Sequence, residues 1–239
     1  MRRALAASLL TLFAVALAWA GKEPWKGKPY QQWTDDDLQQ IFHQSPWSHV
    51  VLIDRTWVPY VTKELPTQPI SGSSRAMPTS GATTAQMAQG SQVRFFVYWA
   101  SSRVMRSALA RQEVLDSGRS EAEAYKDVEQ PLPGYWIAIA GNDMTPFQKN
   151  DEAFFQAHAL LRLKKTKQEI SPNKVTYRRG PDGKAITIAL FYFSNKTSTG
   201  DPLISPNEKN AQFSCPIGQS VLQVNFETQK MVDAKGPDL

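Results

Sequence analysis

The clearest pattern in the chain is a strict alternation of apolar residues over positions 92–101. Every second residue from Val93 to Trp99 is apolar, and Phe96 and Tyr98 make the opposite side largely apolar as well. A period of two is typical of a β-strand, and two apolar sides favour a place inside a sheet, with neighbours on both edges. We therefore predict a central strand here.

Apolar spacing, capping residues and turn residues predict the other elements in the same way. The expected helices follow the N-cap residues Thr34, Ser102 and Ser120 and span 35–44, 103–117 and 121 to about 130, with one more over 146–158. The expected strands span 50–61, 135–140, 159–165, 173–179, 184–193 and 211–226, the last interrupted near Pro216 and Gly218. Together they predict an α+β protein, mainly an antiparallel sheet with short helices packed on it.

The helix expected over 103–117 offers an apolar side formed by Val104, Leu109, Val114 and Leu115. A side of this kind normally packs on the core of the protein. We therefore expect these four residues to face the sheet.

Residues 62–91 break the pattern of strands and helices. They contain three prolines, three glycines and many Ser, Thr, Gln and Ala residues. This composition predicts a long flexible loop, which in a compact domain is either functional or disordered.

The first twenty residues have the composition of a secretory signal peptide. Arg2 and Arg3 precede an uncharged apolar run from Ala4 to Leu17, and Ala18-Trp19-Ala20 supplies small residues at a cleavage site. The alternative is an uncleaved membrane anchor, but the run is short for a membrane span of about 20 residues. We predict cleavage after residue 20, a single domain over residues 21–239 without a transmembrane segment, and a periplasmic or extracellular location.

Charge and cysteine content exclude several classes of protein. Removal of Arg2 and Arg3 with the signal lowers the net charge of the 239-residue chain from +5 to +3, so no specific nucleic-acid binding is expected. Cys215 is the single cysteine, which excludes an internal disulfide. Its alternation with Phe213 favours a buried thiol, whereas a catalytic thiol would need a nearby cation or histidine.

Several short motifs resemble a family of exported bacterial proteins of unknown function. The resemblance covers residues 25 to 226. Its N-terminal motifs are Trp33 before a short helix and the step Ser45-Pro46-Trp47. Its later motifs are the strand with Val93-Arg94-Phe95, the following helix with Arg103, Arg106 and Arg111, and the strand from Gly134 to Ala140. It implies an extracytoplasmic location and no particular activity.

The residue types that usually act as catalytic groups or metal ligands do not form a known motif. His43, His49 and His158 lack the spacing of a metal site, and the acidic run 35–37 is better explained by a helix N-terminus than by a calcium loop. Ser171 begins an S-x-x-K match without its partner motifs, and no glycine-rich phosphate loop is present. We therefore predict no catalytic residue, no metal ligand and no cofactor.

Two features are candidates for a binding role, although each also has an ordinary structural explanation. Residues 159–184 hold eight basic and two acidic side chains, so they carry +6 while the rest of the mature chain carries −3. On neighbouring strands these cations would attract an acidic protein or an anionic envelope polymer, and otherwise they form a solvated sheet face. The candidate binding residues are Arg162, Lys164, Lys165, Lys174, Arg178 and Arg179.

The second feature is a cluster of four tryptophans, Trp25, Trp33, Trp47 and Trp57. If exposed, they would stack on sugar rings or anchor a partner, and if buried they belong to the core. We expect an exported, non-enzymatic protein that binds or assembles with an envelope component. The alternative is an envelope-directed hydrolase whose site the sequence does not reveal.

Export is directly testable. We expect protein isolated from its native host to begin at or near Gly21, because signal peptidase would cleave after Ala20. Mass spectrometry of the intact protein measures this end. Intact chains that begin at Met1 in the cytoplasm would contradict the prediction.

Overall fold

The fold is known from a computed structural model, which describes residues 23–55, 92–126 and 128–239. The helices are α2 (Pro24–Gly27), α3 (Asp35–Gln44), α5 (Arg103–Ser117), α6 (Glu121–Ala124), α7 (Thr145–Lys149) and α8 (Glu152–His158), with two 3-10 turns, η1 (Tyr30–Gln32) and η2 (Thr228–Lys230). The strands are β1 (Ser48–Asp54), β2 (Gln92–Trp99), β3 (Gly134–Gly141), β4 (Leu160–Leu163), β5 (Glu169–Ile170), β6 (Lys174–Arg179), β7 (Ile186–Ser194), β8 (Ala211–Ile217), β9 (Ser220–Phe226), β10 (Val232–Asp233) and β11 (Gly236–Pro237).

The strands form two antiparallel sheets and one short hairpin. The first sheet has the order β1-β2-β3-β7-β6, the second has the order β5-β4-β8-β9, and β10 pairs with β11. Strand β2 lies between β1 and β3, which confirms the central position predicted from its two apolar sides. The expected α+β class, with mainly antiparallel strands, is confirmed.

The two sheets pack face to face through aromatic side chains. Phe191 of β7 meets Phe213 of β8 with ring centroids 5.2 Å apart, and Trp99 of β2 meets Phe226 of β9 at 5.1 Å. All four rings are fully buried. Because aromatic side chains bury the most apolar area, these contacts form the centre of the core.

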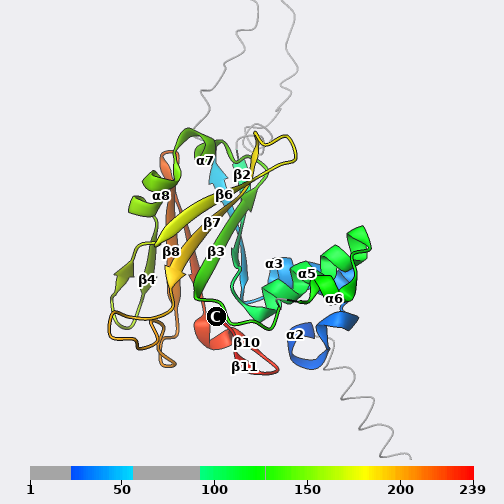
Figure 1. Ribbon diagram of the computed structural model, residues 1–239. Helices are drawn as coiled ribbons and strands as arrows, with labels where there is room; N and C mark the ends of the chain where they lie inside the picture. Colours follow the sequence, from blue (N-terminus) through cyan, green and yellow to red (C-terminus); the bar gives the residue numbers. More distant parts are fainter. Residues whose placement is uncertain (1–22, 56–91, 127) are drawn as a thin grey trace, which may run out of the picture.

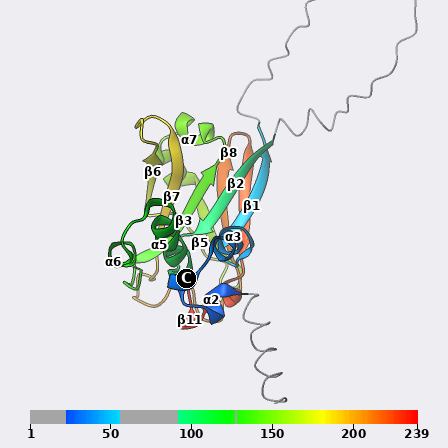
Figure 2. The same cartoon turned by 90° about the vertical axis from the view of Figure 1, so that its right-hand side faces the viewer.

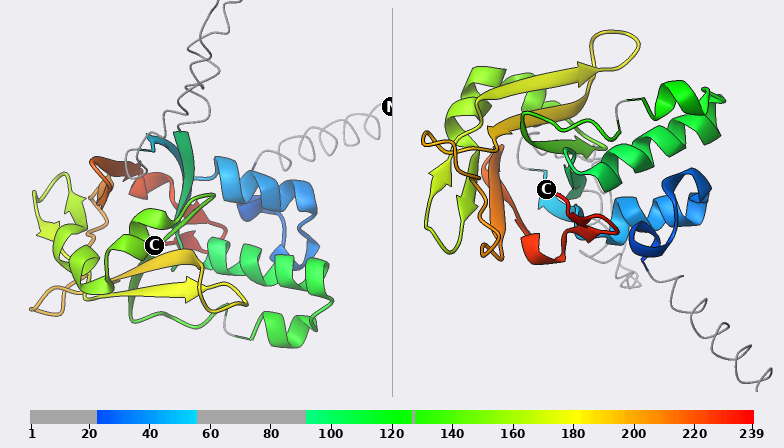
Figure 3. Two further views of the ribbon diagram at one scale, coloured as in Figure 1. Left: turned by 90° about the horizontal axis from the view of Figure 1, so that it is seen from above. Right: turned by 60° about the horizontal axis from the view of Figure 1, so that its bottom comes forward.

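The longer helices lie on the other side of the first sheet. Figure 1 shows three layers, with β4 and β8 on one side, the five-stranded sheet in the middle, and α3 and α5 on the far side. In Figure 2 these helices lie over the lower part of the sheet, and β2, β3 and β7 extend beyond them. Figure 3 shows α3 and α5 side by side, and α5 beside α6.

The first two long helices begin and end where their capping residues predict. Thr34 and Asp37 form a reciprocal capping box at the start of α3, and Ser102 accepts a hydrogen bond from the amide of Met105 at the start of α5. Helix α5 ends at Ser117 and is followed by the cap residue Gly118, whose φ of 65° is readily adopted by glycine.

Two helix predictions need correction. The helix after Ser120 was expected to reach about Gln130 but ends at Ala124, and the ring of Tyr125 instead packs on Tyr30 at 4.9 Å. The single helix expected over 146–158 is two helices, because the side chain of Asp151 accepts a hydrogen bond from the amide of Phe154 and so starts α8 anew.

The strand predictions differ from the structure mainly at their ends. β1 begins at Ser48 rather than Val50, and the expected stretch 211–226 forms the hairpin β8–β9 around Gly218. The turn over 180–183 joins β6 to β7 as predicted, with Gly183 at a φ of 69°. The signal peptide, residues 56–61 of the expected strand and the expected loop 62–91 lie outside the described residues.

Three of the four clustered tryptophans belong to the core. Trp25, Trp33 and Trp47 are all buried, and Trp57 lies outside the described residues. Cys215 is also fully buried beside the second sheet's core residues, and this burial raises the pKa of its thiol well above the ordinary value. Within the described ranges, none of the helices combines the length and apolar composition needed to cross a membrane.

The last residues of the chain fasten α5 to the sheets. The Asp238 carboxylate accepts hydrogen bonds from the amides of Arg103 and Val104, at 2.7 and 3.0 Å, and so caps the first turn of the helix. The indole of Trp47, which precedes β1, donates to the carbonyl of Asp238 at 2.7 Å. Arg103 also forms a bidentate salt bridge with the carboxylate of Asp233 in β10, with N···O distances of 2.8 and 3.0 Å.

We expect Asp238→Ala to lower the free energy of unfolding by about 1–3 kcal/mol, because it leaves two helix amides without their charged acceptor. Denaturant unfolding followed by circular dichroism measures the loss. Asp116→Ala, an exposed position on the same helix, is the control and should change stability by no more than about 0.5 kcal/mol. Equal effects of the two substitutions would contradict the assigned role of Asp238.

Candidate functional site

An open apolar groove of about 280 Å³ lies between α3, α5 and the five-stranded sheet. Its walls are Gln39, Phe42 and His43 of α3 and Met105, Leu109 and Gln112 of α5. Its floor is formed by Tyr98, Ala100, Ala138, Ala140 and Ile188. The floor residues of β3 are alanines, and such small side chains leave room for a ligand to approach the sheet closely.

The groove is part of a larger surface, which we call the outer face. It consists of the side chains of the five-stranded sheet that point away from the second sheet. Cross-strand register defines it, because Val50, Phe96 and Ala140 are paired in one row and Tyr98, Ala138 and Leu190 in another. Further apolar members are Leu52, Trp136, Ile188 and Tyr192.

Much of the outer face is accessible to solvent. Leu52 is 56% exposed and Val50 is 44% exposed, although both are large apolar residues. Leu109 of α5 is 47% exposed and Leu115 is 41% exposed. The prediction that Leu109 and Leu115 face the core is therefore wrong, because α5 turns Val104 and Met105 inward together with small residues such as Ala108.

Aromatic rings in and next to the groove pack on one another. Phe42 meets Tyr98 edge to face at 6.2 Å, Tyr98 stacks with Phe96 at 6.4 Å, and the His43 ring lies 5.4 Å from Phe96. Burial raises the pKa of Tyr98 to about 12, as expected for a hydroxyl in apolar surroundings. Rings held in this way lose little conformational entropy when a partner binds.

Three cations lie at the margins of the outer face. In the strand register Arg94 is opposite Leu52, Lys174 is opposite Tyr192, and Arg178 is opposite Ile188. All three are exposed, and none has an ion-pair partner within the part of the chain that the structure describes.

Asp54 is the one acidic side chain among the outer-face positions of the five strands, and it accepts a hydrogen bond from Gln92. The charge of the outer face is therefore positive.

The predicted basic binding residues are divided between the two sheets. Arg162 lies on β4 and pairs with Glu169, and Lys164 and Lys165 follow it in the turn to β5. Lys174, Arg178 and Arg179 lie on β6.

Strand alternation separates the two neighbouring arginines of β6. Arg178 is opposite Ile188 and Arg179 is opposite Ile186, with a register shift between them, and Arg179 donates to the carbonyl of Lys184 at 2.9 Å. Of the six residues, the structure brings only Lys174 and Arg178 together on the outer face. Binding of a polyanion by the six residues stays a prediction.

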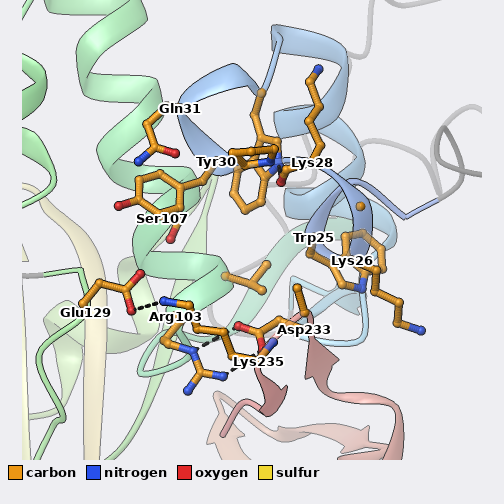
Figure 4. Close-up of a pocket in the computed structure, with 15 residues that line it drawn as sticks. Trp25, Lys26, Lys28, Tyr30, Gln31, Arg103, Ser107, Glu129, Asp233 and Lys235 are labelled. Carbon is orange, nitrogen blue, oxygen red and sulfur yellow. Dashed lines mark hydrogen bonds and ion pairs between the residues drawn. The ribbon is translucent and has the colours of Figure 1, made fainter. Parts of the chain in front are cut away.

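A second cleft, of about 390 Å³, lies between the N-terminal segment, the start of α5 and the β10–β11 hairpin (Figure 4). Trp25 and Tyr30 contribute apolar lining. Its charged side chains are already paired with one another or with neighbours, as the contacts Arg103–Asp233, Lys235–Glu129, Lys28–Asp37 and Lys26–Glu23 show. Because these ion pairs already satisfy the charged side chains of the cleft, those side chains are not free to bind a ligand. The groove is therefore the better candidate for a binding site.

The three histidines, His43, His49 and His158, do not come together. His43 lines the groove, whose lining includes no carboxylate or serine, and His158 stacks on Phe154 of the same helix at 4.4 Å. Across the described segments, no three side chains of His, Cys, Asp or Glu are arranged to hold a metal ion.

His49 is the histidine nearest to a catalytic arrangement. It shares a polar cavity of about 320 Å³ with Ser45 and Glu227. However, the Ser45 hydroxyl donates to the carbonyl of Ile41 at 2.6 Å, and Nε2 of His49 is buried without a hydrogen-bond partner among the described residues. A nucleophile and its base would be expected to bond to each other, so this cavity does not favour hydrolysis.

No family model, no curated protein and no solved structure matches this chain. The resemblance to exported bacterial proteins of unknown function therefore stays a prediction.

Sequence reasoning missed the groove, although one signal pointed to it. Phe96 and Tyr98 make the second side of β2 apolar, which predicts a central place in the sheet but does not by itself predict a groove. The pattern does not show how much of that side the helices cover, because this depends on the position of α5 in space.

His49 gives a testable pH dependence. Burial lowers the pKa of its imidazole below 6.5, and nearby Glu227 opposes this only in part. Because the unfolded chain takes up the proton first, stability should fall as pH falls below about 6.5. Thermal unfolding between pH 7 and pH 5 should show a smaller loss for His49→Leu than for the wild type. Identical losses would contradict a buried neutral imidazole.

Proposed function

We propose that this chain is an exported, non-enzymatic binding protein that docks onto an envelope component through its outer face. The observation that carries the proposal is the open apolar groove, which has exposed Leu109 on its wall and lies on the same sheet face as exposed Leu52. The predicted signal peptide is the reason for placing the partner in the envelope.

Exposed apolar surface is the first argument for docking. An antiparallel sheet often leaves one face in water, and the side chains of that face are then mostly polar, since uncovered apolar side chains order water unfavourably. Here α3 and α5 cover one end of the face only (Figure 2). Contiguous apolar patches that a protein leaves exposed usually mark sites of interaction.

The composition of the surface is the second argument. Interfaces between proteins are enriched in Tyr, Trp, Phe, Met and Arg. The outer face and its groove contain Tyr98, Trp136, Phe42 and Arg178. The described cavities do not join a nucleophile to a base, so docking has more support than the envelope-directed hydrolase.

A photo-crosslinking experiment tests the docking surface. The full chain is expressed in its native host with benzoylphenylalanine in place of Leu109 on the groove wall, and the cells are irradiated. We expect an envelope adduct of higher mass, because this position would touch the partner. Immunoblotting and mass spectrometry detect and identify it.

Benzoylphenylalanine in place of Val221 is the matched control. Val221 is 63% exposed and apolar, but it lies on β9 of the second sheet. We expect little or no adduct there. The absence of an adduct at position 109, or the same adduct at both positions, would contradict docking through the outer face.

A further inference from the structure

We infer that the component that docks on the outer face is a protein segment which is both amphipathic and acidic, with apolar side chains for the groove and carboxylates for Arg94, Lys174 and Arg178. This inference rests on the proposed function, since it names the partner of the same surface. The segment would add to the helix layer that α3 and α5 begin.

Unpaired charge is the first observation behind the inference. The structure gives an ion pair to nine other basic residues, among them Arg55, Arg111 and Arg162. The cations of the outer face have no such partner among the described residues. Complementary charge across an interface guides association and suppresses wrong partners.

The arrangement of charge beside apolar surface is the second observation. Arg178 is the cross-strand neighbour of Ile188, which lines the groove, and Lys174 is the neighbour of Tyr192, whose ring packs on Trp136 at 5.1 Å. A partner that fills the groove with apolar side chains therefore brings its flanks next to these cations. Carboxylates at those flanks would pair with them.

The same arrangement favours a protein over other anionic partners. An anionic polymer of the envelope would satisfy the cations but has few apolar groups to fill the groove. A lipid chain is usually held in a concave site that covers most of its surface, whereas this groove is open along the sheet. An amphipathic helix laid in a groove is a common way for proteins to recognise each other.

The test uses the Leu109 photo-crosslink together with two charge reversals of equal size. Lys174→Glu with Arg178→Glu changes two outer-face cations. Lys164→Glu with Lys165→Glu changes two exposed cations in the turn between β4 and β5 of the second sheet, and thus controls for net charge. All four positions are exposed, so both variants should fold, and circular dichroism verifies this.

We expect the outer-face reversal to lower the adduct yield about tenfold, because repulsion replaces attraction at two positions. The control reversal should leave most of the yield. The cross-linked peptide, sequenced by mass spectrometry, should carry Asp or Glu beside apolar residues.

Each other outcome has a distinct meaning. An adduct that resists both reversals, or one with a neutral peptide, would overturn the acidic partner but leave docking intact. Equal losses of adduct from both reversals, or an adduct with a polysaccharide or a lipid, would also overturn the inference of an acidic protein partner. No adduct in the unreversed protein would overturn the proposed function itself.

Discussion

The hydrogen bonds from the first amides of α5 to the Asp238 carboxylate hold the helix layer in place. A helix leaves its first amides without partners, and here a side chain from the end of the chain accepts two of them while Ser102 accepts a third. The carbonyl of Asp238 in turn accepts the indole N–H of Trp47, at the junction of α3 and β1. One residue thus connects the start of α5 to the segment that joins α3 with the sheet.

This connection determines which part of the sheet is covered. Because α5 is fixed at its N-terminal end, it lies over one end of the outer face and presents Leu109 as a wall of the groove. The remaining strand surface, with Leu52 and Val50, stays uncovered by the described helices. The geometry that fixes the helices therefore also creates the surface on which we expect a partner to dock.

Local signals in the sequence predicted much of the fold. The alternation in β2, the caps Thr34 and Ser102, and Gly118 at the end of α5 act over a few residues, and they appear in the structure as expected. One prediction failed for a local reason, because the N-cap at Asp151 divides the helix expected over 146–158. The other predictions that failed depended on contacts between distant segments.

The contact of Tyr125 with Tyr30 accompanies the early end of α6, and Asp238 caps a helix 135 residues before it. No local pattern identifies either partner.

The candidate site was predicted least well, for a related physical reason. The sequence showed a run of cations, but strand pairing distributes it over two sheets and leaves Lys174 and Arg178 on the outer face. Likewise, the apolar spacing of α5 did not show that Leu109 is exposed.

Hydroxyl-radical footprinting would test the central claim most directly, because it measures the solvent accessibility of individual side chains. Leu52, Leu109 and Val221 are all exposed in the isolated chain and should be oxidised readily in purified protein. In intact envelopes of the native host, we expect Leu52 and Leu109 to be protected several-fold while Val221 reacts as before. Equal oxidation of all three residues in both samples would contradict the claim that a partner covers the outer face.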